Sequence, residues 1–135
     1  MIWLWLERHS NLFTSHPRIL HIAPEVSIMH HFKRHYKGFE DRYITADLES
    51  PLADMHFDVQ QIPLEERSID VVICNHLLEH VESDRQALNE LYRILRPGGW
   101  GIMLVPEDRS RATTFEDDTI TDAKERTRLF GQYDH

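Results

Sequence analysis

Short apolar runs alternate along the chain with stretches whose apolar residues recur at helical spacing. The runs stand at residues 19–23, 43–46, 69–74 and 100–105, with a weaker one at 55–57. Such short runs are typical of buried strands. Apolar residues three and four apart predict helices over residues 2–12, 26–36 and 83–95. Ser83 and Gln86 form a capping box at the start of the last helix, and residues 96–99 (Arg-Pro-Gly-Gly) form the turn that ends it.

The order of these elements predicts a fold. Strands that alternate with helices indicate an α/β domain, in which a parallel sheet with right-handed crossovers is covered on both faces. A polar loop over 107–118 and a charged helix over about 121–130 would follow the last strand. In such sheets ligands bind beyond the carboxyl ends of the strands. The residues at those ends are Ala23, Pro24, Glu25, Asp47, Asp58, Asn75, His76 and Glu107.

Composition narrows the class of protein. The 135 residues fit one domain, and 15 basic against 23 acidic side chains give a net charge of −8. This charge argues against a protein that coats nucleic-acid phosphate. A single cysteine, Cys74, excludes an intramolecular disulfide and fits a reducing compartment, so we expect a cytoplasmic protein. The apolar start stops at Glu7 without a preceding basic region, so we expect neither a signal peptide nor a membrane span.

Two carboxylates at strand ends suggest a nucleoside site. Asp47 lies 22 residues beyond Glu25, close to the offset at which a carboxylate accepts the hydroxyls of a bound ribose. Asp58 follows the third strand, where it could accept a hydrogen bond from an exocyclic amine such as that of adenine. For both residues the alternative interpretation is an ordinary solvated loop carboxylate.

Four segments, in this order and spacing, resemble class I S-adenosylmethionine-dependent methyltransferases, in the group often called type 11. They are residues 57–64, 68–74, 76–81 and 90–99, and the likeness extends from about Arg18 to Val105. It implies a Rossmann-like three-layer sandwich with a mainly parallel sheet in the order 3-2-1-4-5. The whole chain, 1–135, would be a single methyltransferase-like domain. Its parts would be an N-terminal helix (1–17), a cofactor-binding core (18–106) and a loop with a C-terminal helix (107–135).

The resemblance also implies a function, transfer of a methyl group from S-adenosyl-L-methionine to an unknown acceptor. The loop 23–25 would face the methionine end of the cofactor, Asp47 the ribose and Asp58 the adenine. The implied cofactor-binding residues are His21, Ala23, Pro24, Glu25, Asp47, Leu48, Asp58, Val59, Asn75, His76 and Leu77. His76 and Glu107 are the candidates for a base that takes a proton from the acceptor. We expect no metal ligands.

The first strand departs from the family pattern. Members usually carry an acidic residue there and a glycine-rich loop after it, where this chain has His21 and then Ala23, Glu25 and Ser27. Glycines let the backbone approach a ligand closely, whereas Pro24 removes a donor. The segment Leu-His-Ile-Ala-Pro-Glu at 20–25 is similar to that of a methyltransferase subgroup. One hypothesis is that Glu25 receives the ammonium group of the cofactor in place of the lost acid.

Two other functions stay open. The string at 76–80, His-Leu-Leu-Glu-His, also matches the inverzincin signature, and on a helix His76 and His80 could share a zinc ion in a metallopeptidase. The altered loop favours a non-catalytic module that senses the cofactor or binds a partner. Full-length family members add an antiparallel hairpin to the fifth strand, whereas the residues after Val105 indicate a loop and a helix. We therefore expect a truncated member that lacks the hairpin and self-associates through an exposed edge strand.

Overall fold

A parallel sheet of five strands forms the centre of the computed structural model, which describes residues 2–107, 122 and 124–125. The strand order is β3-β2-β1-β4-β5, as the sequence predicted. The strands are β1 (Ile19–Ile22), β2 (Tyr43–Asp47), β3 (Met55–His56), β4 (Ile69–Asn75) and β5 (Leu95–Leu104). The helices are α1 (Ile2–His9), α2 (Leu12–Ser15), α3 (Val26–His35) and α4 (Asp84–Ile94), with short 3₁₀ turns η1 (Glu40–Arg42) and η2 (Leu78–His80).

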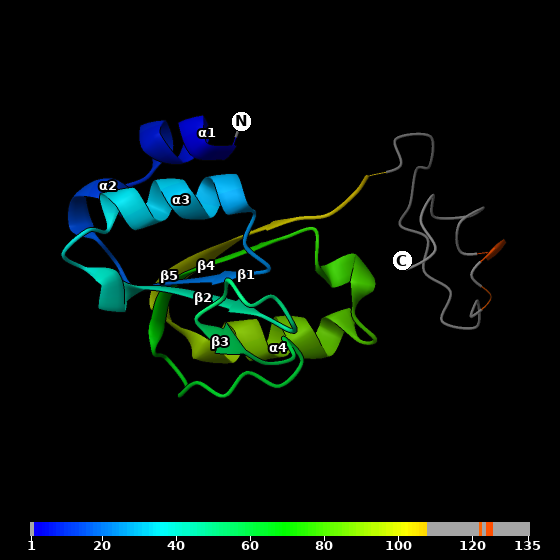
Figure 1. Ribbon diagram of the computed structural model, residues 1–135. Helices are drawn as coiled ribbons and strands as arrows, with labels where there is room; N and C mark the ends of the chain where they lie inside the picture. The colour runs from blue at the N-terminus through cyan, green and yellow to red at the C-terminus, as the bar shows by residue number, and fades with distance from the viewer. Residues whose placement is uncertain (1, 108–121, 123, 126–135) are drawn as a thin grey trace.

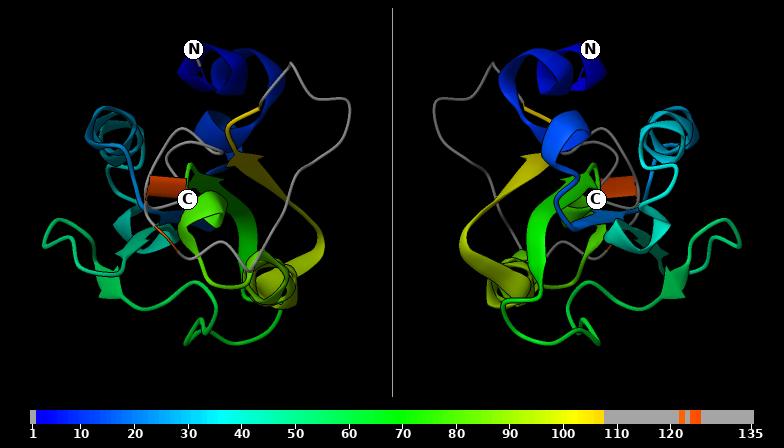
Figure 2. Two further views of the ribbon diagram at one scale, coloured as in Figure 1. Left: turned by 90° about the vertical axis from the view of Figure 1, so that its right-hand side faces the viewer. Right: turned by 90° about the vertical axis from the view of Figure 1, so that its left-hand side faces the viewer.

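Helices cover both faces of the sheet, so the molecule has three layers (Figures 1 and 2). Helices α1, α2 and α3 lie on one face, where Phe32 and Leu6 pack against Val71 of β4. Helix α4 covers the other face, where Leu91 packs in the cluster that includes Val72. Because successive residues of a strand point to opposite faces, the continuous apolar run of β4 supplies both cores. The Rossmann-like prediction is confirmed.

The N-terminal helix is two helices, not the single one predicted over 2–12. Leu6 and Leu12 are both fully buried. Residues six apart on one continuous helix point in different directions, so only a break lets both leucines reach the core. The side chain of Ser10 stabilises the break, because its hydroxyl donates to the carbonyl of Leu6 at 2.6 Å and accepts the amide N–H of Leu12 at 3.4 Å.

Half of the predicted capping box forms at the start of α4. The Ser83 hydroxyl accepts the Gln86 N–H at 3.3 Å, as expected of an N-cap. The reciprocal bond is supplied by Gln60, whose side-chain oxygen accepts the Ser83 N–H at 2.8 Å. The Gln86 amide in turn donates to the backbone carbonyl of Gln60 at 3.0 Å. The loop that carries Asp58 is thereby tied to the start of α4.

The predicted turn at 96–99 is in fact an irregular part of strand β5. Helix α4 ends at Ile94, and Leu95 already pairs with Ile69 of β4. The next pair joins Trp100 to Val71, so a bulge absorbs the residues between. Gly98 adopts φ +83°, and a Cβ on Gly99 would lie 2.8 Å from the Asp70 carbonyl oxygen. Gly98 is therefore needed for its backbone conformation, and Gly99 is needed because a side chain there would clash.

Some predictions fall outside the described residues. The charged helix over 121–130 and most of the loop over 107–118 lie there, as does the region where the family hairpin would stand. In the part of the chain that the structure describes, no helix combines the length and apolar character needed to cross a membrane.

Candidate functional site

The carboxyl ends of β1 and β4 meet where the chain changes direction across the sheet. The chain leaves β1 toward α3 on one face, and leaves β4 toward α4 on the other (Figure 1). Open α/β sheets bind their ligands at such a switch point. We call this side of the molecule the carboxyl edge.

Glu25 lies across this switch point and links the two strands. Its Oε2 is 3.3 Å from Nε2 of His21, and its Oε1 accepts a hydrogen bond from the Asn75 amide at 3.2 Å. The other ring nitrogen of His21, Nδ1, lies 2.8 Å from the hydroxyl of Tyr43. His21 and Asn75 are buried, whereas the side chain of Glu25 keeps 38% of its surface exposed. A carboxylate is thus held in a fixed position with one side open.

These contacts set the protonation of the group. The bond from His21, helped by its own backbone N–H and by Asn75, lowers the pKa of Glu25 to about 2 against the opposing effect of burial. Burial raises the pKa of Tyr43 well above its ordinary value, so its hydroxyl stays protonated. When Tyr43 donates to Nδ1, the imidazole proton resides on Nε2 and is donated to Glu25. The result is a permanent negative charge at neutral pH.

The loop after β1 has a left-handed turn without a glycine. Ala23 adopts φ +48°, and its N–H donates to the carbonyl of Ala46 at 2.8 Å. A non-glycine residue in this region is uncommon and strained, and such residues cluster at functional sites. Pro24 follows, and Glu25 is the N-cap of α3 without a side-chain capping bond. The first N–H groups of α3 therefore face the carboxyl edge uncapped by that side chain.

Asp47, at the end of β2, uses one oxygen to order its own loop. Its Oδ1 accepts the N–H groups of Glu49 at 2.9 Å and Ser50 at 2.8 Å. The described residues offer no hydrogen-bond donor to Oδ2. The loop thus fixes the carboxylate and leaves an acceptor for a ligand. Leu48 beside it is 65% exposed.

Asp58 and Val59 come from the loop after β3, next to β2. Asp58 is exposed, and its Oδ1 accepts the N–H of Gln60 at 2.8 Å. The Val59 side chain is buried in the core beneath α4, so only its backbone is available at the surface. Phe57 donates its N–H to the Asp47 carbonyl at 3.3 Å, which brings both aspartates to the same side of the sheet.

A second cluster follows the end of β4. His76 adopts φ +52°, and its N–H donates to the carbonyl of Leu104 at 2.7 Å. Its Nδ1 lies 3.7 Å from Oε1 of Glu79. Glu79 Oε2 and Asn75 Oδ1 are buried and have no hydrogen-bond partner among the described residues. Such orphaned acceptors are rare in proteins, and here both lie by the carboxyl end of β4.

The remaining candidates lie around this cluster. Leu77 is half-buried against the core beneath α4, and Glu107 is exposed beyond the end of β5. Sequence reasoning did not identify Glu79 as a site residue, because it appeared only as part of a metal-binding string. The signal that could have identified it is its position four residues after the last residue of a buried strand.

The helix required by the zinc interpretation does not form. His76 precedes η2 in a left-handed conformation, and residues 78–80 form a single 3₁₀ turn. His76 and His80 are therefore not one α-helical turn apart on a shared face, so the arrangement that this alternative requires is not present. Within residues 2–107, 122 and 124–125, no three His, Cys, Asp or Glu side chains are grouped as metal ligands.

Cys74, the residue before Asn75, is fully buried. Burial, with smaller contributions from Glu79 and Glu25, raises the pKa of its thiol to about 12. The thiol therefore stays protonated, as expected of a residue that serves packing.

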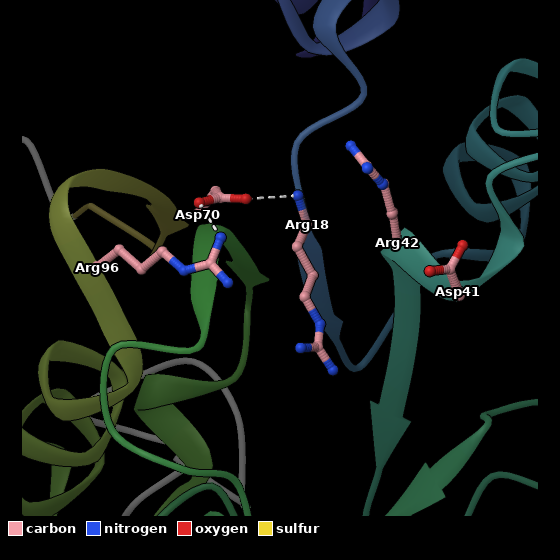
Figure 3. Close-up of a pocket in the computed structure, with 5 residues that line it drawn as sticks. All are labelled: Arg18, Asp41, Arg42, Asp70 and Arg96. Carbon is pink, nitrogen blue, oxygen red and sulfur yellow. Dashed lines mark hydrogen bonds and ion pairs between the residues drawn. The ribbon is translucent and has the colours of Figure 1, made fainter.

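A cavity of about 360 Å³ lies at the opposite, amino edge of the sheet (Figure 3). It is lined by Arg18, Asp41, Arg42, Asp70 and Arg96. Asp70 accepts the backbone N–H of Arg18 and a guanidinium N–H of Arg96, each at 2.8 Å. In Figure 3 the side chains of Arg18 and Arg42 extend in opposite directions, so their guanidinium groups do not converge on one point. This cavity lies away from the residues that the sequence predicted.

Comparison with known proteins identifies the fold and family. The model of a family described as "Methyltransferase domain" matches residues 17–103. A malonyl-[acyl-carrier protein] O-methyltransferase from Yersinia pestis is 30% identical over 80 residues, covering 51% of this chain and 30% of that protein. An uncharacterized 37.1 kDa protein in a Streptomyces fradiae transposon is 38% identical over 69 residues, covering 51% and 20%. The chain thus spans less than a third of the length of these relatives.

Solved structures share the architecture. The trans-methyltransferase CalH in complex with SAH superposes with a TM-score of 0.50 at 20% identity, covering 64% of this chain and 31% of that one. A putative methyltransferase from Bacillus halodurans gives 0.50 at 18% identity, covering 86% and 51%. At these identities the likeness concerns the fold alone.

Proposed function

Because this chain belongs to the methyltransferase domain family, we propose that it binds S-adenosyl-L-methionine at the carboxyl edge and transfers the methyl group to an acceptor. The acceptor is not identified by any residue described here. The single observation that carries the proposal is the pair of fixed acceptors at the switch point, the ionised carboxylate of Glu25 and the buried, unpartnered Oδ1 of Asn75.

The cofactor fits these groups chemically. Its ammonium group has only donors, and Glu25 and Asn75 Oδ1 are acceptors on two adjacent strands. Its carboxylate suits the uncapped N-terminus of α3, because helix N-termini favour anions. Charge and hydrogen-bond capacity therefore match at the methionine end, even though the glycine-rich loop is replaced.

The two aspartates, Asp47 and Asp58, would bind the adenosine end of the cofactor. Asp47 would accept the ribose hydroxyls, since the loop N–H groups already fix its carboxylate. Asp58 would accept from the adenine amine, with the backbone of Val59 beside it. Exposed Leu48 would cover the nucleoside. The remaining predicted residues, His21, Ala23, Pro24, His76 and Leu77, would position or line the methionine end.

Bound cofactor supplies an electrophilic methyl group on a sulfonium sulfur. The protein then has to align the acceptor and remove its proton where it carries one. His76 is the stronger of the two candidates for the base, because its side chain is 58% exposed at the end of β4. Glu107 is the other candidate.

Isothermal titration with S-adenosylhomocysteine tests the proposal directly. We expect the wild-type protein to bind and Asp47→Ala to bind about tenfold or more weakly, since a hydrogen bond to a charged group contributes about 1.5–3 kcal/mol. Asp41→Ala removes an exposed carboxylate at the amino edge and is the matched control. A wild-type protein that does not bind, or equal affinities for Asp47→Ala and wild type, would refute the site.

Three further parts of the proposal are separate from the site. We infer that the protein is cytoplasmic. We infer that the chain forms one domain whose three parts end at residues 17, 106 and 135. We also infer that it self-associates through β5. Among the described residues β5 pairs with β4 only, which supports an available edge. Sedimentation analysis over a range of concentrations tests the last point. Turnover on candidate acceptors separates an enzyme from a module that only senses the cofactor.

A further inference from the structure

An exposed histidine and a buried glutamate stand together at the carboxyl edge. The His76 side chain is 58% exposed, whereas that of Glu79 is 8% exposed. Glu79 Oε1 lies 3.7 Å from Nδ1 of His76, which is an ion-pair separation longer than a hydrogen bond, and catalytic contacts of this kind commonly shorten when ligand binds. Its Oε2 is buried without a partner among the described residues. Burying a carboxylate with an unpaired oxygen is costly, so a purely structural role gives little reason for a glutamate here.

The backbone of His76 is fixed by a contact of its own. His76 adopts φ +52°, which is strained for a residue with a Cβ, and its N–H donates to Leu104 O at 2.7 Å. The ring is thus presented from a fixed turn directly after Asn75, the residue that contacts Glu25. With Nδ1 toward Glu79, the opposite ring nitrogen, Nε2, lies on the far side of the ring.

We propose that Glu79 is a positioning residue that keeps the His76 proton on Nδ1, so that Nε2 is free to act as the base of methyl transfer. A nucleophile is typically activated by a base that a third group orients. Here the acceptor would be the nucleophile, His76 the base and Glu79 the orienting group. The inference rests on the proposed function, because the base has a task only beside a bound methyl donor. It concerns acceptors that lose a proton, such as a hydroxyl or an amine.

The proton and electron balance is simple. A lone pair of the acceptor forms the bond to the methyl carbon as the carbon–sulfur bond breaks, and that electron pair goes to sulfur. The acceptor proton moves to Nε2 of His76. The imidazolium formed is stabilised by the Glu79 carboxylate, and the exposed ring returns the proton to water.

Long-range ¹H–¹⁵N NMR of the neutral imidazole tests the assignment without any acceptor. Free histidine favours the proton on Nε2, so we expect wild-type His76 to show the unusual Nδ1–H form. Glu79→Leu, of similar volume and suited to a buried position, should return His76 to the Nε2–H form. Glu79→Gln keeps an oxygen acceptor and should retain Nδ1–H. Glu82→Gln removes an exposed charge three residues away and is the control.

Each outcome decides the matter. An Nε2–H form in the wild type overturns the proposal, as does the same tautomer in Glu79→Leu and Glu79→Gln. Circular dichroism confirms that each variant is folded, and Glu79→Met, an apolar side chain of similar length, takes the place of Glu79→Leu if that variant unfolds. Titration of S-adenosylhomocysteine on the same samples keeps the two proposals apart. If the wild-type protein does not bind S-adenosylhomocysteine, the proposed function is refuted. If it binds but His76 carries its proton on Nε2, only this inference is refuted.

Discussion

The two edges of the sheet carry opposite kinds of unsatisfied polar group. At the amino edge three arginines and two aspartates line a cavity of about 360 Å³, and the buried Nε of Arg18, a donor, has no partner among the described residues. At the carboxyl edge the unpartnered atoms are acceptors, Asn75 Oδ1 and Glu79 Oε2. Positive φ angles do not separate the edges, because Ala23 and His76 follow strands β1 and β4 whereas His16 and Arg67 precede them.

The two edges therefore differ in the kind of polar group that each leaves unpaired. The amino-edge cavity is divided between an ion pair and guanidinium groups that point apart, as Figure 3 shows. The carboxyl edge has fixed acceptors at the topological switch point, where α/β sheets bind ligands. The proposed cofactor carries ammonium and sulfonium cations, which match acceptors, so the polarity of the two edges supports the proposal that it binds at the carboxyl edge.

The largest expected effect is on cofactor affinity. Glu25→Ala removes the charged acceptor for the ammonium group and should weaken binding of S-adenosylhomocysteine about tenfold or more, whereas Asp70→Ala at the amino edge should leave it unchanged. Isothermal titration on both variants gives the answer. Equal losses in the two variants would break the distinction between the edges.

The amino edge should instead respond in stability. A Cβ on Gly99 would meet backbone oxygens at 2.8 and 2.9 Å, so Gly99→Ala should lower the free energy of unfolding by about 1–3 kcal/mol. In Gly101→Ala the closest atom is the flexible end of Met103, so this variant should lose less. Urea denaturation measures both. If Gly101→Ala lowers the free energy of unfolding as much as Gly99→Ala does, the close contact between a Cβ at residue 99 and the backbone oxygens is not the cause.

Acid should affect the carboxyl edge through Glu25. Its pKa in the folded protein, about 2, lies below the ordinary 4.5, so its stabilising contribution is complete above pH 4.5 and is lost as pH falls toward about 2. Because the group is partly exposed, we expect only about 1 kcal/mol. Glu25→Gln should therefore reduce the acid sensitivity of unfolding over that range. A wild-type and a variant curve of identical shape would contradict the network.

The smallest effect concerns the start of α4. Ser83→Ala removes the cap and should cost about 1 kcal/mol in the free energy of unfolding, measured by thermal or urea denaturation. Ser68→Ala, which removes an exposed hydroxyl bond to the Glu65 carbonyl, is the control and should cost less. A cost as small as that of the control would mean that the Ser83 hydroxyl does not stabilise the start of α4.

Local patterns predicted the strands and the central helices well, because each depends on neighbours in sequence. The run at 69–74 became β4 with one more residue, and residues 26–35 became α3 within the predicted 26–36. The misses arose where distant contacts decide. Leu6 and Leu12 had to reach one core, which split the first helix, and pairing with β4 drew residues 96–99 into β5.

For the candidate site, too, the sequence predicted the features that depend on local position and missed those that depend on distant contacts. Sequence placed Glu25, Asp47 and Asn75 at strand ends, since parallel strands bring those ends together. It also suggested that Glu25 replaces the missing acid. It did not reveal that Tyr43 and His21 hold that carboxylate, because this contact depends on the register in which His21 lies opposite Thr45 of β2.

The amino-acid sequence by itself determined the alternation of strands and helices, which follows from periodicity, and its family resemblance determined the expected strand order. The tertiary structure alone decided which acceptors lack partners and which carboxylate is held ionised. Hydrogen bonds between Glu25 and Asn75, 50 residues apart, and the burial of Glu79 exist only after the strands pack together. The protonation of a side chain and its unpaired hydrogen-bonding atoms depend on the groups packed around it, so a local sequence pattern does not predict them.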